Sequence, residues 1–567
     1  MIEKDISCHR SYEYGAYVIA GKKNEKLQGT LKFSNGAPPS FRTNTNFDIS
    51  SKEVDFLRDN KEVITCVTDI ESFRFILLNS RFSYNVIYPE SLIKGDKIGQ
   101  ILSVEILLNG FSTWINPKRK LEFEVSDDED IKNLHDCKIS EEVNINSRRY
   151  LIESNLCLET KRVEKQDCLI TEYTTITVKS LNGFIKHEFA QEVAHKIRIL
   201  FSLLLGFQLS FENIWLNTDR AERIPFYFPC SGDKNDPFEH YLECTLLPQH
   251  LSNKKLWNPV LNNFFANKLF EQIWSRLPFM FSYKGAWEYE LLGCISLLDA
   301  CCSEFVDKSR KKLSKNKYKE IISDLLLVLD KHQVKLGCEC SSILESFKAT
   351  VSNIRNTNLP TFKEKFHALT ETIEPEVLEM ISLSEEQFDH VKSIRDKAAH
   401  GRTPRLFKED DLNYEFIVRD KIKLLLTYLF YRDFGIDAVT FSSTLRETIN
   451  KTVQNAYINK FARDKIIGGV PFYEVEKGDF DEVSNKNNGS LVIYHSTHKK
   501  TYSVNFELSQ SIKNEWYDEK SKEYRCVVDF IKSKIDSYVS VEYVSRLYLI
   551  CSDKNKEIYG ACLITTE

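Results

Sequence analysis

Ser393-Ile394-Arg395-Asp396-Lys397-Ala398-Ala399-His400-Gly401 places an arginine and a histidine five residues apart at the predicted end of a helix. The helix is predicted to begin at Ser384, because Ser384-Glu385-Glu386-Gln387 has the spacing of a capping box. Gly401 suits the left-handed position just past the last turn. We therefore expect Arg395 beside the apolar face and His400 on the last helical residue. The apolar face recurs at helical spacing and comprises Phe388, Val391, Ile394, Ala398 and Ala399.

Arg395 and His400 have side chains suited to phosphodiester cleavage. A guanidinium binds two phosphate oxygens through a planar fork and stays charged. An imidazole titrates near neutrality, so it can take or give a proton at working pH. The spacing alone is weak evidence, because a chain with 12 histidines is expected to contain roughly one or two such pairs by chance. The alternative is that Arg395 is a buried ion-pair partner and His400 a helix cap.

The composition is that of a globular protein. The chain has 567 residues, 42% of them hydrophobic and 28% charged, which allows two to four domains with cores of their own. The net charge of −5 supplies no global field that attracts nucleic acid, so an RNA site must be a local basic patch. The 15 cysteines are scattered and no signal peptide is recognised, which predicts reduced thiols in the cytoplasm. The longest apolar stretch, Ile199–Phe211, is too short to span a bilayer, so we expect no membrane association.

Residues 1–245 show mostly a period of two, which predicts an antiparallel β domain with one packed helix at about His187–Leu209. No catalytic constellation is found there, so we expect a recognition module, either a sensor or a reader of the substrate. The expected strands are Tyr14–Ala20, Gln28–Phe33, Glu62–Thr68, Ser83–Tyr88, Ile101–Leu108, Lys120–Val125 and Cys168–Val178.

Residues 246–440 change to a period of 3.6 and predict an all-α bundle. Residues 441–567 predict a helix continuing to about Arg463 and then a small α+β region with a hairpin, a helix and two long strands. The expected fold class is therefore multidomain α+β. The expected helices of the bundle are Leu261–Leu277, Trp287–Val306, Tyr318–Leu336, Ser342–Ile354, Thr361–Ile373, Glu385–His400 and Asp411–Phe434.

Two basic clusters are candidate RNA contacts. The first surrounds Arg395, and the second lies at Lys308–Lys319, where Tyr318 could stack on a base. The alternative is that both are solvated segments. The expected RNA-binding residues of the first cluster are Lys392, Lys397, Arg402 and Arg405.

A metal site is not expected. Cys338 and Cys340, with His332 upstream, form one possible ligand set, but structural zinc sites usually show two paired sets. The sequence contains neither the carboxylate cluster of a two-metal nuclease nor a Gly-rich phosphate loop. A nuclease built on this chain is therefore predicted to need no metal and no cofactor.

The arginine, the polar residue after it, the small alanines, the histidine and the glycine, set among amphipathic helices, resemble the R-x(4–6)-H signature of HEPN ribonucleases. The order of a β-rich region followed by such a bundle is similar to that of ApeA-type proteins of bacterial antiphage defence. The resemblance implies that Arg395 holds the scissile phosphate, His400 is the acid–base residue and Asp396 positions them, although Asn is commoner at that place.

The same resemblance implies a homodimer that cleaves host RNA, with tRNA as the expected target, after a phage-derived trigger, so that infection is aborted. The competing interpretation is a non-catalytic HEPN dimer that binds nucleotide or a partner protein as a sensor or regulatory module.

Overall fold

The computed structural model divides the chain into two compact units. One comprises residues 1–285, 375–383 and 407–567, and the other comprises residues 286–374 and 384–406. The predicted limits of three domains, at 245/246 and 440/441, stay a prediction. The residues that the structure describes are 6–20, 25–44, 57, 59, 62–69, 73–116, 137–162, 168–230, 236–306, 313–336, 341–354, 360–399, 412–485, 491–517 and 524–566.

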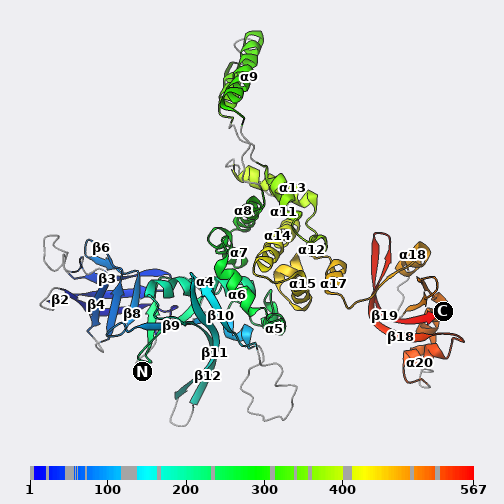
Figure 1. Cartoon of the computed structure of the whole chain (residues 1–567), viewed down its shortest axis with the longest axis horizontal. Coiled ribbons are helices and arrows are strands. Elements are labelled where there is room, and N and C mark those ends of the chain that lie inside the picture. The colour runs from blue at the N-terminus through cyan, green and yellow to red at the C-terminus, as the bar shows by residue number, and fades with distance from the viewer. Residues whose placement is uncertain are drawn as a thin grey trace. The chain divides into compact units, whose positions relative to one another are not determined.

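The N-terminal region is a 14-stranded sheet whose neighbouring strands pair antiparallel (Figure 1). This confirms the predicted antiparallel β region. In spatial order the strands are β10 (Ser140–Ile145), β11 (Arg148–Arg162), β12 (Cys168–Ser180), β9 (Ile101–Leu108), β13 (Phe211–Thr218), β14 (Arg223–Tyr227), β8 (Ser91–Lys94), β5 (Arg74–Leu78), β4 (Val63–Thr68), β1 (Tyr12–Ala20), β2 (Glu25–Ser34), β3 (Ala37–Thr43), β7 (Val86–Tyr88) and β6 (Arg81–Ser83).

Two local features of this sheet differ from expectation. The predicted single strand Ser83–Tyr88 is wrong, because Tyr84 has a positive φ of 48° and divides the stretch into the hairpin β6–β7. Strand β3 was not among the expected strands. Its residues Pro38 and Pro39 lie at a register shift in the β2–β3 pairing, where a missing donor is tolerated. The predicted strand Lys120–Val125 lies outside the described residues.

Helix α4 (His187–Leu205) confirms the helix predicted within the β-rich region, but it ends four residues early. Gly206 ends it in the left-handed conformation, with φ 74°. A Cβ at Gly206 would lie 2.4 Å from Thr245 Cγ2, so the chain after the helix is closely packed there. The short helix α2 (Phe111–Ile115) also contributes to this core, where Trp114 Nε1 donates to the Leu246 carbonyl at 2.7 Å.

Further helices, most of them short, follow within the same unit. The predicted helix Leu261–Leu277 is wrong, because Asn267 ends the first part and its Oδ1 accepts from Leu269 N at 2.7 Å. The predicted continuation of helix to Arg463 is also wrong, since separate caps at Asp437, Asn450 and Asn459 start three helices. The helices are α5 (Pro248–Asn253), α6 (Trp257–Ala266), the π-helix η2 (Phe270–Trp274), α7 (Leu277–Phe281), α12 (Pro375–Ile381), α14 (Leu412–Asp433), α15 (Ala438–Glu447), α16 (Lys451–Asn455) and α17 (Lys460–Ile467).

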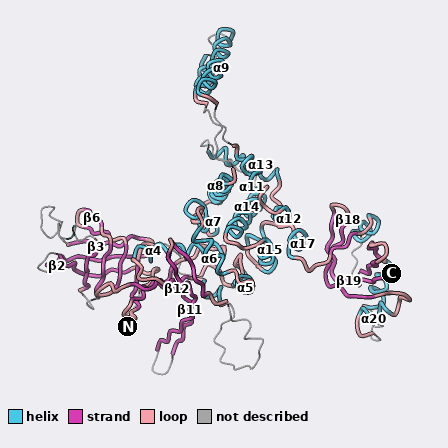
Figure 2. Tube along the Cα trace, viewed as in Figure 1, coloured by secondary structure: helices cyan, strands magenta, loops and turns pink. Residues whose placement is uncertain are grey.

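The C-terminal region contains a five-stranded mixed sheet with helices packed against both faces. Figure 2 shows its strands in magenta and its helices in cyan beside the C-terminus. Val492 and its neighbours Leu491 and Ile493 point to opposite faces, as period two requires. The predicted hairpin and the two long strands are confirmed. In spatial order the strands are β15 (Phe472–Glu474), β18 (Ser540–Cys551), β19 (Lys554–Thr566), β16 (Leu491–Ser496) and β17 (Thr501–Val504); the helices are α18 (Lys477–Asn485), α19 (Phe506–Ser511), η5 (Ile512–Trp516) and α20 (Val527–Lys532).

The second unit is entirely helical in its described part. Helices α9 and α10 form an antiparallel hairpin, in which the Tyr318 hydroxyl donates to the Ile354 carbonyl and Lys348 Nζ pairs with Asp330 at 2.7 Å. None of the helices that the structure describes, in either unit, combines the length and the apolar character needed to cross a membrane. The helices of the unit are α8 (Trp287–Glu304), α9 (Lys315–Leu336), α10 (Ser341–Ser352), α11 (Phe362–Thr370) and α13 (Glu385–Ala399).

Candidate functional site

The candidate site is built on helix α13, whose start is the predicted capping box. Ser384 N donates to Gln387 Oε1 at 3.1 Å, and Gln387 N donates to Ser384 Oγ at 3.1 Å. The predicted core residues Phe388, Val391 and Ile394 are buried. The capping box therefore fixes the start of the helix, and the three core residues fix which face turns inward.

Helices α11 and α8 surround that inward face. The ring of Phe388 stacks on Phe366 with centroids 4.0 Å apart and contacts Phe362 at 5.0 Å. Such ring pairs contribute about 0.5–1.5 kcal/mol beyond their buried area. This packing sets the rotation of α13, so Arg395, two turns further along, is directed along the edge of the helix interface.

Arg395 lies between two carboxylates. Its Nη2 donates to Asp299 Oδ2 on α8 at 2.9 Å, and its Nη1 donates to Asp396 Oδ1 at 3.0 Å. The Cζ atom lies 5.5 Å from the centroid of the Phe362 ring. The guanidinium side chain is 37% exposed, whereas Asp299 is 21% exposed. One side of the guanidinium is thus anchored against α8, and the other lies toward the more exposed Asp396.

Asp299 also binds a second cation. Lys365 Nζ on α11 donates to Asp299 Oδ1 at 3.1 Å and to Ser303 Oγ at 3.0 Å. We call the group of Asp299, Ser303, Lys365, Arg395 and Asp396 the Asp299 cluster. Its two carboxylates and two cations balance in charge, and it joins three helices of the same unit.

The carboxylates of the cluster shift the ionisation of Arg395 and of the nearby thiol of Cys302. Burial alone would lower the pKa of Arg395, but the hydrogen bond to Asp396 and the charge of Asp299 outweigh it and raise that pKa. Burial and the nearby charge of Asp299 raise the pKa of the Cys302 thiol to about 12. Arg395 is therefore a permanent cation, and Cys302 is a neutral thiol.

The structure describes only some of the predicted site residues. Arg395 and Asp396 are in contact, and Lys392 is half-buried while Lys397 is exposed on the same helix. His400, Arg402 and Arg405 lie outside the described residues, so their roles stay predictions.

Asp299 and Lys365 were missed by the sequence analysis. A signal existed for Asp299, which is an isolated acid within the apolar run Leu297-Leu298-Asp299-Ala300-Cys301. An acid in such a run needs a partner when the helix is buried. Nothing in the sequence identifies Arg395 or Lys365 as that partner.

The second basic cluster and the possible metal ligands are only partly covered by the described residues. Lys315, Lys317 and Lys319 of the second basic cluster lie in the first turns of α9, while its other members lie outside the described residues. Tyr318 binds Ile354 through its hydroxyl, so it holds the hairpin together. His332 is exposed on α9, and Cys338 and Cys340 lie outside the described residues. Where the structure describes side chains, no three His, Cys, Asp or Glu residues are placed to share a metal ion.

Comparison of this chain with known protein families, curated proteins and solved structures gives no match.

Proposed function

We propose that the chain is a metal-independent endoribonuclease of bacterial antiphage defence, which cleaves host RNA, with tRNA as the expected target, when infection occurs. The observation that carries the proposal is the anchored guanidinium of Arg395, held on α8 by Asp299 and still 37% exposed. Because its rotamer is fixed before substrate arrives, less conformational entropy is lost on binding a phosphate. His400 lies five residues further along the chain and is the proposed acid–base residue.

The two carboxylates have different proposed roles. Asp299 is the less exposed and is shared with Lys365, so it keeps the guanidinium in place. Asp396 is 44% exposed, so a phosphate oxygen can replace its contact with Nη1 and take up a charge-assisted hydrogen bond. Such an exchange leaves the anchored side of Arg395 unchanged.

The proposed chemistry uses the ribose 2′-hydroxyl as nucleophile. RNA is then cut to a 2′,3′-cyclic phosphate and a 5′-hydroxyl, and DNA, which lacks this hydroxyl, is spared. General acid–base catalysis typically contributes about 10²- to 10⁴-fold, so His400→Ala is expected to lose most activity while staying folded.

The test is incubation of purified protein with total cellular RNA in EDTA. Wild type is compared with His400→Ala, Arg395→Ala and the control His332→Ala, which replaces an exposed histidine of the same unit. Wild type and His332→Ala should cut RNA, and the other two should not. Full activity of His400→Ala, or loss of wild-type activity in EDTA, contradicts the proposal.

A second candidate function is a non-catalytic dimer that binds nucleotide or a partner protein. It is favoured by one observation: both hydrogen bonds of the Arg395 guanidinium go to carboxylates of the chain, as in a structural ion pair. In that case neither wild type nor any variant cleaves RNA. Asp299→Asn and Arg395→Gln then lower the thermal stability of the protein by similar amounts. Under the ribonuclease proposal, Arg395→Gln abolishes cleavage in a protein whose fold is retained.

A further inference from the structure

Lys365 on α11 is held in place by two groups of α8. Its Nζ donates to Asp299 Oδ1 at 3.1 Å and to Ser303 Oγ at 3.0 Å. The Ser303 hydroxyl donates its own proton to the Asp299 backbone carbonyl at 2.7 Å, so its oxygen faces the ammonium as an acceptor. The side chain of Lys365 is 20% exposed. The ammonium is therefore a fixed cation within the candidate site.

A lysine on the same helix shows how an ordinary surface ion pair differs. Lys363 pairs with Glu385 at 2.7 Å and with Asp389 at 3.5 Å, and these two carboxylates are 70% and 54% exposed. Asp299 is only 21% exposed. Water and salt screen the charges around Lys363 strongly and those around Asp299 less. An uncompensated charge beside Asp299 therefore acts more strongly on its neighbours.

Asp299 binds its two cations through different oxygen atoms. Oδ1 accepts from Lys365, and Oδ2 accepts from Arg395 Nη2 at 2.9 Å. A carboxylate carries a single negative charge, so it compensates only one of the two cations. One positive charge is therefore left over between the guanidinium and the ammonium.

The more exposed carboxylate, Asp396, takes up that remaining charge in the structure. It accepts from Arg395 Nη1 at 3.0 Å, and its side chain is 44% exposed. When a phosphate oxygen replaces Asp396, the three charged groups that remain carry one net positive charge, which matches the single negative charge of a phosphodiester. Without Lys365, Arg395 and Asp299 would cancel, and the phosphate would meet a neutral pair.

We propose that Lys365 is a positioning residue that acts on Arg395 through Asp299: it compensates the carboxylate, so that Arg395 meets the phosphate of RNA with its full positive charge. The inference rests on the proposed function of Arg395 as the phosphate-binding group. It divides two requirements between two residues. Asp299 fixes the rotamer of the guanidinium, and Lys365 cancels the negative charge that this carboxylate would otherwise set against the phosphate.

The test measures binding of a labelled single-stranded RNA of mixed sequence whose 2′-hydroxyls are methylated, so that it cannot be cut. Fluorescence anisotropy gives the Kd of the full-length protein at several salt concentrations. Lys365→Met should weaken binding about tenfold, as Arg395→Gln should. It should also make the dependence of log K on log[salt] shallower by about 0.7, because one phosphate is no longer neutralised. Lys363→Met is the control and should bind within about twofold of wild type.

A double variant separates charge compensation from packing. Asp299→Asn combined with Lys365→Met removes both charges, while the amide oxygen at position 299 can still accept from Arg395. The double variant should recover most of the affinity that Lys365→Met loses, which a purely structural role of Lys365 would not allow. Lys365→Arg should retain most of the wild-type affinity, because it keeps the positive charge.

Circular dichroism and thermal melting establish that each variant is folded. If Lys365→Met is not, Lys365→Gln takes its place, since its amide can still donate to Asp299. Weakened binding by Arg395→Gln with unchanged binding by the neutral variant of Lys365 overturns this inference and leaves the phosphate role of Arg395 standing. Failure of the double variant to recover affinity also overturns it. Wild-type affinity in Arg395→Gln, or a wild type that does not bind, overturns both the inference and the proposed function.

Discussion

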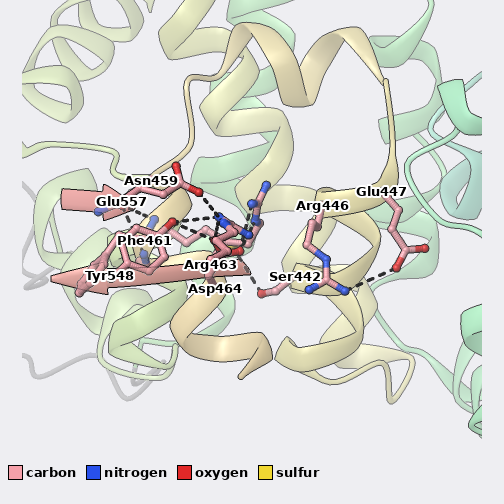
Figure 3. A network of polar contacts seen from close by, with 12 residues as sticks. Ser442, Arg446, Glu447, Asn459, Phe461, Arg463, Asp464, Tyr548 and Glu557 are labelled. Carbon is pink, nitrogen blue, oxygen red and sulfur yellow. Dashed lines mark hydrogen bonds and ion pairs between the residues drawn. The ribbon is translucent and has the colours of Figure 1, made fainter. Parts of the chain in front are cut away.

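Asp464 is a fully buried carboxylate on α17, where it binds the C-terminal sheet (Figure 3). Its Oδ1 accepts from Arg463 Nε at 3.1 Å, and its Oδ2 accepts from the Tyr548 hydroxyl at 2.9 Å and from Arg546. Arg546 also binds Glu557, so two strands and one helix share the network. Every charge in this group has an opposite partner, which is the condition for burying it.

We expect Asp464→Asn to destabilise the protein by about 3 kcal/mol or more, because both arginines lose their shared carboxylate. The control is Arg446→Ala on α15, shown in the same figure, where the nearest carboxylate atom of Glu447 lies 3.9 Å away and the two side chains are 39% and 43% exposed. That change should cost no more than about 0.5 kcal/mol. Denaturant unfolding of the two variants measures the difference, and equal losses would refute the assignment.

Because the ring of His195 is buried, we expect the folded protein to lose stability in acid. The ring packs against Phe228 at 4.8 Å and Phe211 at 5.7 Å, and burial lowers its pKa from 6.5 to about 4. In the unfolded chain this histidine takes up a proton as the pH falls through 6.5, whereas in the folded chain it does so only near pH 4. Stability from this group is therefore complete above pH 6.5 and falls by about 3 kcal/mol as the pH decreases to about 4.

The measurement is the free energy of unfolding of wild type and His195→Gln between pH 7 and pH 4. The wild-type value should fall more steeply than that of the variant, by about 3 kcal/mol over the window. His332→Gln, at an exposed position, should follow the wild-type curve. Parallel curves for wild type and His195→Gln would show that the histidine is protonated in the folded state.

The candidate site shows what can be inferred residue by residue. The capping box at Ser384 and the buried face of α13 were predictable, because they depend on residues within one helix. The contacts of Arg395 with Asp299 and of Asp299 with Lys365 were not, since they join residues 96 and 66 positions apart. Spacing along a chain carries no information about which distant helix lies opposite.

At the scale of elements, long periodic segments were predicted well and short ones poorly. Helices α9 and α13 and strands β18 and β19 have enough turns or alternations for their period to be unambiguous. The run from Leu261 to Leu277 was predicted as one helix, yet it is interrupted at Asn267 and includes a π-helical turn. Such breaks depend on side-chain hydrogen bonds that the apolar pattern does not show.

The hairpin of α9 and α10 is the least buried pair of helices in the described chain. Leu344 is 5% exposed, whereas Phe347, one turn later, is 53% exposed. Isolated helices of this length are marginal in water, so the hairpin depends on the few side chains between its helices. The exposed apolar side chains contribute little to holding the two helices together.

Leu344→Ala is therefore expected to loosen the hairpin by about 2 kcal/mol or more, and Phe347→Ala by no more than about 0.5 kcal/mol. Amide hydrogen exchange of α9 reports this locally. Exchange in α9 should accelerate in the first variant and stay unchanged in the second. A loss of α9 protection in Phe347→Ala would show that the outer face is covered by another surface.

At the scale of the whole molecule, the proposed chemistry requires two chains. Cleavage needs a base for the 2′-hydroxyl and an acid for the leaving oxygen, whereas the proposed motif offers one imidazole, that of His400. A two-fold dimer supplies both from identical residues. We expect a homodimer formed through α13 and its neighbours.

Sedimentation of the wild-type protein tests the assembly. An excess of the His400→Ala chain should also inhibit wild type, because mixed dimers contain a single imidazole, while an equal excess of an unrelated protein should not. An active monomer would exclude this arrangement.

We propose that the β-rich region restrains the nuclease until an infection-derived ligand binds; the alternative is that it selects the RNA. A shift from 1:99 to 99:1 in a two-state equilibrium needs about 5.5 kcal/mol of differential binding. Deleting residues 1–245 is the obvious test, but the chain around the cut is deeply embedded. Cys244, Thr245 and Leu246 are buried, and Thr448 Oγ1 donates to the Cys244 carbonyl at 2.6 Å.

A fragment of residues 246–567 should therefore fail to fold alone. The Tyr431 hydroxyl, fully buried on α14, contacts Thr245 Oγ1 at 3.2 Å and donates to the Leu204 carbonyl at 3.2 Å, and the deletion removes both. Losing the hydrogen bonds of the hydroxyl alone, as in Tyr431→Phe in the full chain, should cost about 1 kcal/mol of stability. The deletion also exposes the apolar face of α14 to water, which should cost far more. The fragment should aggregate without a cooperative thermal transition, and co-expression with residues 1–245 should restore a soluble complex. If the fragment melts cooperatively by itself, the helical region is independent, and its toxicity without infection then decides directly between restraint and RNA selection.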